Sequence, residues 1–162
     1  MGYKLREASL PVLPAGHREI RVLHFSDLHL TPARKKEIAD IKSWAKLKPD
    51  LVISTGDFLA HMEAVPVVLN ALDELLNLPG LFVFGSNDYY APLMKNPFSY
   101  LMNDDGTRKH GEELPWRGLK ASLEQLGWID LTHVKTKIQI KDTLIEARGT
   151  DDAHLMRDDY QL

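Results

Sequence analysis

The chain has 162 residues, of which 44% are hydrophobic, and these values are typical of one globular domain with a buried core. Its net charge of -3 and its lack of a Lys/Arg block exclude non-specific nucleic-acid binding from the predicted functions. The absence of Cys excludes disulfides, zinc–thiolate sites and thiol catalysis.

The N-terminal part of the chain carries no long apolar stretch of the kind found in a signal peptide or a membrane span. We therefore expect a cytoplasmic protein with no transmembrane segment, a location that is compatible with peripheral membrane association. Residues 3–12 are expected to be extended, residues 14–16 to form a turn, and residues 21–26 to form the first buried strand.

The hydrophobic pattern of residues 21–84 predicts two consecutive βαβ units. Short apolar runs at 21–26, 51–54 and 81–84 are typical of buried parallel strands. Residues 34–47 and 64–76 place apolar side chains at helical spacing between these runs. A strand, a crossover helix and a parallel strand need about 30 residues, so the spacing predicts a parallel βαβαβ sheet.

The pattern changes in the second half of the chain. Residues 89–118 scatter Pro and Gly among polar and basic residues, as in a functional lid or a disordered segment. Helical spacing resumes at 114–126, and residues 134–140 and 143–147 are expected to form an antiparallel hairpin. We therefore predict an α/β fold, a parallel sheet followed by a helix and a hairpin, in a single domain spanning residues 1–162.

An Asp, an Asp and an Asn follow the three predicted parallel strands at equal intervals. Asp27, Asp57 and Asn87 are 30 residues apart in sequence. Because ligands of open α/β sheets bind beyond the carboxyl ends of the strands, these side chains are expected to share one crevice. His29 follows Asp27 in the same loop. Carboxylate, imidazole and amide groups suit a divalent ion such as Mn, Fe or Zn, so the sequence predicts a metal site.

The same residues are suited to two ions. Asp57 has two carboxylate oxygens and is the natural bridge. Asp27 and His29 would then bind one ion, and Asn87 the other. Two divalent ions about 3.5–4 Å apart can hold a phosphate ester and activate a water for in-line attack. The predicted function is metal-dependent hydrolysis of a phosphate ester, by a phosphomonoesterase or a phosphodiesterase.

The residues resemble the first three motifs of the calcineurin-like metallophosphoesterases. The matching segments are Asp27-Leu-His29, Gly56-Asp57 and Gly85-Ser-Asn87-Asp88, and residues 149–154 resemble a segment of bacterial members of the family. The resemblance implies a sandwich of two sheets flanked by helices. It also implies that Asp27 and His29 bind the first metal, that Asp57 bridges, and that Asn87 binds the second metal.

The third motif departs from the family pattern. An ungapped match puts Ser86 on the family's Asn, whereas a shift of one residue keeps Asn87 as the ligand. We favour the shift because a carboxamide oxygen is a better ligand than a hydroxyl. Both matches lack the His that usually protonates the leaving group, so the general acid is expected to be Asp88, His154 or solvent.

A second departure is that the family's later His motifs do not follow within the 162 residues. The resemblance then implies that the first metal lacks one His ligand and the second lacks two, so that two ions or only one would be bound. We expect the N-terminal part of a longer phosphoesterase. The alternative hypothesis is a truncated or degenerate copy that acts as a scaffold or binds metal weakly.

Two further expectations concern the surface and the end of the chain. An uncovered sheet edge and uncovered apolar surface would favour self-association. Asp151 and Asp152, near the end of the chain, are equally suited to capping a turn and to reaching the metals.

Overall fold

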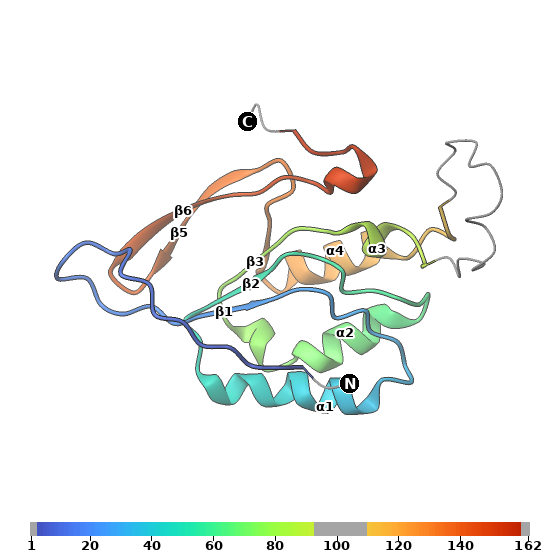
Figure 1. The fold of residues 1–162 in the computed structure, drawn as a ribbon, viewed down its shortest axis with the longest axis horizontal. Helices are drawn as coiled ribbons and strands as arrows, with labels where there is room; N and C mark the ends of the chain where they lie inside the picture. Colours follow the sequence, from blue (N-terminus) through green and yellow to red (C-terminus); the bar gives the residue numbers. More distant parts are fainter. Residues whose placement is uncertain (1–2, 93–109, 160–162) are drawn as a thin grey trace, which may run out of the picture.

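The computed structural model of the chain describes residues 3–92 and 110–159 (Figure 1). Its main sheet has four parallel strands in the order β1-β2-β3-β4. The strands are Val22–Phe25, Leu51–Ser54, Gly80–Phe82 and Ile129–Asp130. The connecting helices are α1 (Lys35–Ser43), α2 (Ala64–Leu72) and α4 (Trp116–Gln125). The predicted α/β fold with a parallel sheet is confirmed.

Several elements differ from the prediction in length or number. The first two helices end early and continue as the 3-10 helices η1 (Trp44–Leu47) and η2 (Leu75–Asn77). The two-residue strand β4 and the four-residue helix α3 (Ser86–Tyr89) have no counterpart in the sequence prediction. These elements are too short to show a hydrophobic period.

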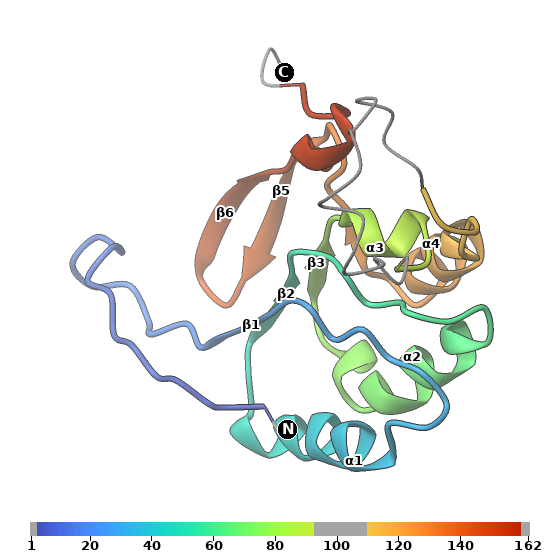
Figure 2. The same ribbon diagram turned by 45° about the vertical axis from the view of Figure 1, so that its right-hand side comes forward.

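The two faces of the sheet are covered by different elements. Neighbouring parallel strands in sequential order, joined by right-handed crossovers, place their helices on one face. Figures 1 and 2 show α1 and α2 on one side of the sheet and the hairpin of β5 (Lys135–Ile140) and β6 (Thr143–Arg148) on the other. The predicted hairpin is confirmed, and it forms a two-stranded sheet of its own.

Each face of the main sheet has a separate hydrophobic core, because side chains alternate along a strand. Val52 and Phe82 face the helices, and Leu51 and Leu81 face the hairpin. The core on the helix side also contains Ile41, Val68, Leu72, Leu119 and Leu123. The core on the hairpin side contains Leu131 and Ile140, with Ile138 and Ile145 partly buried against it. The hairpin therefore begins a second layer over the sheet.

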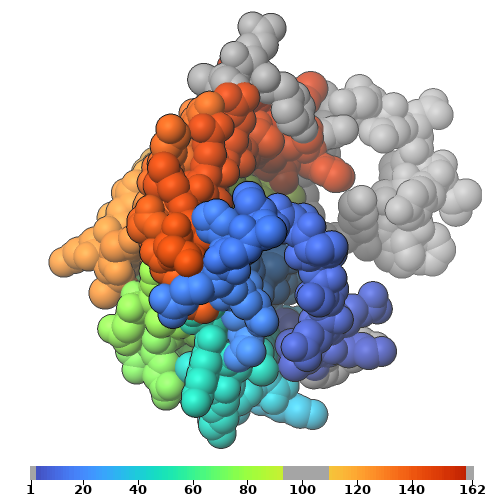
Figure 3. Space-filling model, turned by 90° about the vertical axis from the view of Figure 1, so that its left-hand side faces the viewer, coloured from blue at the N-terminus to red at the C-terminus, as the bar shows by residue number. Residues whose placement is uncertain are grey.

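The N-terminal segment lies beside the hairpin, where Figure 3 shows it in blue against the orange and red strands. His17 Nδ1 and Thr143 Oγ1 are 3.0 Å apart in a hydrogen bond. Lys141 Nζ donates to the Glu19 carbonyl at 2.7 Å and to the Asp50 carboxylate at 2.6 Å. These contacts join the hairpin to the start of the main sheet.

Most of segment 89–118, expected to be a functional lid or a disordered segment, lies outside the described residues, which stop at 92 and resume at 110. On the flanks of this gap, the rings of Tyr90 and His110 stack with their centroids 4.6 Å apart. Within 3–92 and 110–159, no helix is both long enough and apolar enough to cross a membrane. The cytoplasmic location stays a prediction.

Candidate metal site

Asp27, His29 and Asp57 lie together beyond the ends of β1 and β2. One ligand atom from each lies within 4.8 Å of the others. His29 Nε2 is 3.6 Å from Asp27 Oδ1 and 3.8 Å from Asp57 Oδ2. An ion that bonds nitrogen and oxygen at about 2.0–2.2 Å can bridge atoms up to roughly 4 Å apart, so the two distances from His29 suit a divalent metal.

The two loops that carry these residues extend the parallel pairing of β1 and β2. The backbone N–H of Asp27 donates to the Gly56 carbonyl at 3.1 Å, and that of His29 to the Asp57 carbonyl at 2.9 Å. Leu28 and Leu30 are fully buried and alternate with the two candidate ligands. This alternation anchors the first loop in the core and leaves Asp27 and His29 side chains 66% and 31% exposed.

All three residues of the cluster have left-handed backbone conformations. Their φ angles are 56° for Asp27, 42° for His29 and 60° for Asp57. A residue other than Gly in this region costs on the order of 1–3 kcal/mol, and such strain is concentrated at functional sites. The conformation agrees with a functional role but is shared by Lys48, His133, Lys141 and Met156, which lie outside the cluster.

Two glycines allow the loops after β2 and β3 to touch. Gly56 has a φ of +97°, and a Cβ there would lie 2.4 Å from Gly85 N. A Cβ on Gly85 would lie 2.2 Å from Asp57 Oδ1. Sterics therefore explain why Gly occupies these positions of the second and third motifs. Any side chain there would separate the two loops or displace the Asp57 carboxylate.

Asn87 lies directly beside Asp57. Its backbone N–H donates to Asp57 Oδ1 at 3.0 Å, and its Nδ2 donates to Asp57 Oδ2 at 2.9 Å. A rotation of the amide would present its oxygen to an ion bound at this carboxylate. The backbone N–H of Ser86 instead donates to Asp152 Oδ2 at 3.0 Å. That bond involves the backbone of Ser86 and not its hydroxyl, so the choice of Asn87 over Ser86 as the ligand stays a prediction.

Asp88 is fully buried and faces the backbone of the neighbouring loops. Its carboxylate accepts hydrogen bonds from the backbone N–H groups of Asp57 (2.7 Å), Phe58 (2.7 Å), Leu59 (3.0 Å) and Gly85 (3.0 Å). Burial raises the pKa of Asp88 to about 7, while these N–H donors act in the opposite direction. Asp88 thus joins the loops after β2 and β3, and its role as general acid stays a prediction.

The remaining sequence candidates lie in the C-terminal part of the described chain. His154 is exposed in the 3-10 helix η4 (Ala153–Leu155). Asp151 and Asp152 bond to α3, as described below, and Asp152 caps η4 by accepting from Leu155 N. Within the described residues, none of the three joins the cluster of potential metal ligands. The capping role is therefore the one that the structure shows for Asp152.

A further acidic residue, Asp130, ends β4 and is not part of the cluster of potential metal ligands. Its side chain is only 6% exposed, and it accepts a hydrogen bond from Lys120 Nζ of α4. Its other oxygen accepts from the backbone N–H of Thr132 at 2.8 Å. Both carboxylate oxygens of Asp130 therefore have protein partners.

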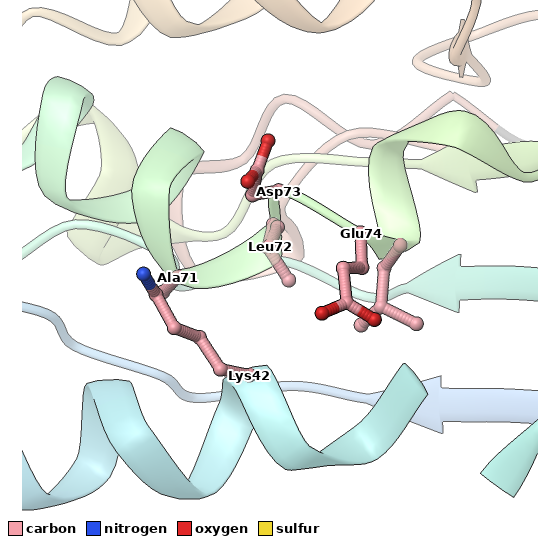
Figure 4. A pocket seen from close by; sticks show the side chains of 6 residues that line it. Lys42, Ala71, Leu72, Asp73 and Glu74 are labelled. Carbon is pink, nitrogen blue, oxygen red and sulfur yellow. The ribbon is translucent and has the colours of Figure 1, made fainter. Parts of the chain in front are cut away.

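A small pocket lies away from these strand ends, between α1 and the C-terminal end of α2 (Figure 4). Its lining includes Lys42, Asp73 and Glu74. This end of α2 leads into the start of β3, the opposite edge of the sheet from Asn87. The pocket therefore belongs to a different part of the surface from the candidate metal site.

Comparisons with known proteins indicate the family of this chain. Residues 20–157 match the calcineurin-like phosphoesterases. The chain is also 30% identical over 145 residues to a protein of Bacillus subtilis (strain 168) that bears the name "uncharacterized metallophosphoesterase YkoQ". That match covers 86% of this chain and 46% of the relative, so the chain spans about half the length of this relative.

The fold and these matches together define an α/β protein of the calcineurin-like phosphoesterase class. The chain belongs to the calcineurin-like phosphoesterase family, as the three motifs at the strand ends predict. The family implies metal-dependent hydrolysis of phosphate esters.

Proposed function

We propose that this chain hydrolyses phosphate esters with two divalent metal ions bound at the ends of β1, β2 and β3. The observation that carries the proposal is the cluster of Asp27, His29 and Asp57, whose ligand atoms lie within 4.8 Å of one another. Membership of the calcineurin-like phosphoesterase family supports it. The number of ions, their identity as Mn, Fe or Zn, and the choice between phosphomonoesters and phosphodiesters are parts of this proposal.

In the proposal each side chain has a defined role. Asp27 and His29 would hold the first ion, Asp57 would contribute to both ions, and Asn87 would contribute to the second. Bound divalent ions would polarise the phosphoryl group and lower the pKa of a water between them.

Proton transfer to the leaving group needs a group that can reach the crevice. Asp88 is fully buried and accepts four backbone hydrogen bonds, so we assign it to positioning Asp57. His154 and solvent are the remaining donors from the sequence prediction, and His154 is exposed. We propose that one of these supplies the proton.

The proposal is tested by turnover of chromogenic phosphodiesters and phosphomonoesters with Mn²⁺. The wild-type chain is expected to hydrolyse at least one of them. Asp57→Asn is expected to lower kcat/KM by roughly 100-fold or more, since a bound metal contributes several kcal/mol to transition-state stabilisation. The matched control is Asp73→Asn, because Asp73 is exposed at the end of α2. Equal rates for the two variants would contradict the proposal.

A second candidate function is that of a non-catalytic scaffold or weak metal binder. It is favoured by the ligand count, because the described residues offer one cluster of three His, Asp or Glu ligands. A second ion would have only Asp57 and Asn87 from these residues. A folded chain that binds metal at the Asp27 cluster and turns over no ester would support this function.

A further inference from the structure

A segment outside the three motifs holds α3, the helix that carries Asn87. This tail segment, residues 149–157, follows β6. Asp152 Oδ2 accepts a hydrogen bond from the backbone N–H of Ser86 at 3.0 Å. Asp151 Oδ1 accepts one from the Tyr89 hydroxyl at 2.7 Å. The tail segment therefore holds both the first and the last residue of α3.

The tail segment is itself ordered around these two carboxylates. The backbone N–H of Asp152 donates to Asp151 Oδ1 at 2.7 Å, and Asp152 Oδ1 accepts from Leu155 N at 2.9 Å. The guanidinium carbon of Arg157 lies 4.1 Å from the centre of the Tyr89 ring. These contacts fix the positions of both Asp carboxylates, so each can hold the residue of α3 that donates to it.

Helix α3 needs such external contacts. It has only four residues, and a helix of this length has no stability of its own. On one side Asn87 and Asp88 bond to the loop after β2. On the other side it is bonded to Asp151 and Asp152. The place of the Asn87 side chain relative to Asp57 therefore depends on contacts from both sides.

We propose that Asp151 and Asp152 are positioning residues, which hold α3 so that Asn87 can bind the second metal ion beside Asp57. The inference rests on the proposed two-metal function. It predicts that residues of the tail segment control the affinity for the second ion. The affinity of the first ion, held by Asp27, His29 and Asp57, is expected not to depend on them.

The test uses two variants of the whole chain, Asp152→Ala and Tyr89→Phe. Each removes one hydrogen bond to α3, and Tyr89→Phe keeps the buried ring. In the metal-free protein, amide exchange of residues 85–90 is expected to become faster than in wild type, with exchange in β2 unchanged. In a Mn²⁺ titration, binding of the second ion is expected to weaken by about 10-fold, with the first unchanged.

The matched control is Asp158→Ala. Asp158 lies in the same part of the chain and is half-buried like Asp152, but it is not among the residues that bond to α3. If Asp152→Ala unfolds, Tyr89→Phe carries the test. Exchange and second-ion affinity equal to those of Asp158→Ala would overturn the inference, as would a wild-type chain that binds only one ion.

The exchange measurement separates this inference from the proposed function. It requires neither metal nor substrate. A wild-type chain that binds two ions but hydrolyses no ester would contradict the proposed function alone. Unchanged exchange at 85–90 in both variants, with normal turnover, would contradict the positioning role alone.

Discussion

The backbone is strained at the three candidate metal ligands, Asp27, His29 and Asp57, which all have positive φ angles. The surrounding contacts maintain these conformations, since Leu28 and Leu30 are buried on either side of His29. Asp and His tolerate the left-handed region better than most residues, because their short polar side chains can bond locally. The residue types that suit metal binding at these positions therefore also suit the left-handed backbone conformation.

Gly56 provides a test at the residue scale. We predict that Gly56→Ala destabilises the fold by about 2–4 kcal/mol, because Ala at a φ of +97° is strained and its Cβ would overlap Gly85 N. The measurement is the free energy of unfolding from urea denaturation. Metal binding is expected to weaken as well, since the change separates Asp57 from the loop that carries Asn87.

Gly118→Ala is the control for this prediction. Gly118 lies inside α4, and a Cβ there would meet no atom within 4 Å. Removing a helix-interior Gly is expected to stabilise the fold by about 0.5–1 kcal/mol. Equal unfolding free energies for the two variants would contradict the steric account of Gly56.

The candidate metal ligands can be predicted from the sequence, but the hydrogen bonds that hold their loops in place cannot. Asp27, Asp57 and Asn87 can be predicted because they follow apolar strands at equal spacing. The buried position of Asp88 and the bonds of Asp152 cannot be, because their partners are backbone N–H groups, which every residue has. Asp152 and its partner Ser86 are also 66 residues apart in sequence, and no local pattern connects them.

At the scale of elements, an ion pair joins β4 to α4. Lys120 Nζ donates to Asp130, whose side chain is nearly buried. We predict that Lys120→Met, which keeps the aliphatic stem, lowers the free energy of unfolding by about 1–2 kcal/mol at neutral pH. Lys36→Met, at an exposed position of α1, is the control and is expected to change little.

The effect of Lys120 is expected to depend on pH. The hydrogen bond to Asp130 raises the pKa of Lys120 above its ordinary value. A raised pKa in the folded state means that the stabilisation is complete below the unfolded pKa of about 10.4 and is lost as the pH rises through the folded pKa. Urea midpoints of wild type and Lys120→Met should therefore differ at pH 7–9 and converge as the pH rises through the folded pKa of Lys120. A constant difference would contradict this account.

The long elements can be predicted from the sequence and the short ones cannot. The apolar strands at residues 51–54 and 80–82 and the amphipathic α2 have a clear hydrophobic pattern. Strand β4 has two residues and α3 has four, so their existence depends on tertiary contacts. Helix α3 begins at Ser86, directly after Gly85, whose backbone N–H donates to Asp88 where the two loops meet.

At the scale of the whole molecule, the second layer is narrow. The hairpin has two strands, and neither outer edge pairs with another strand in residues 3–92 and 110–159. Leu144 of β6 is 58% exposed. Unpaired strand edges and exposed apolar side chains favour association with another chain.

We therefore predict that the chain self-associates through β5 and β6. Sedimentation velocity over a range of protein concentrations is expected to show a dimer or larger species. Leu144→Lys should shift the equilibrium toward the monomer, because a charged residue on an edge strand opposes pairing. Val12→Lys is the control, since Val12 is exposed in the N-terminal segment. A wild-type monomer at all concentrations would contradict the prediction.

The central claim is that Asp27, His29 and Asp57 bind a divalent metal ion. Anomalous diffraction from crystals of the chain soaked in Mn²⁺ tests it most directly. We expect a peak within about 2.0–2.3 Å of one ligand atom from each of these three side chains. A saturated soak with no peak at the ends of β1 and β2 would contradict the account.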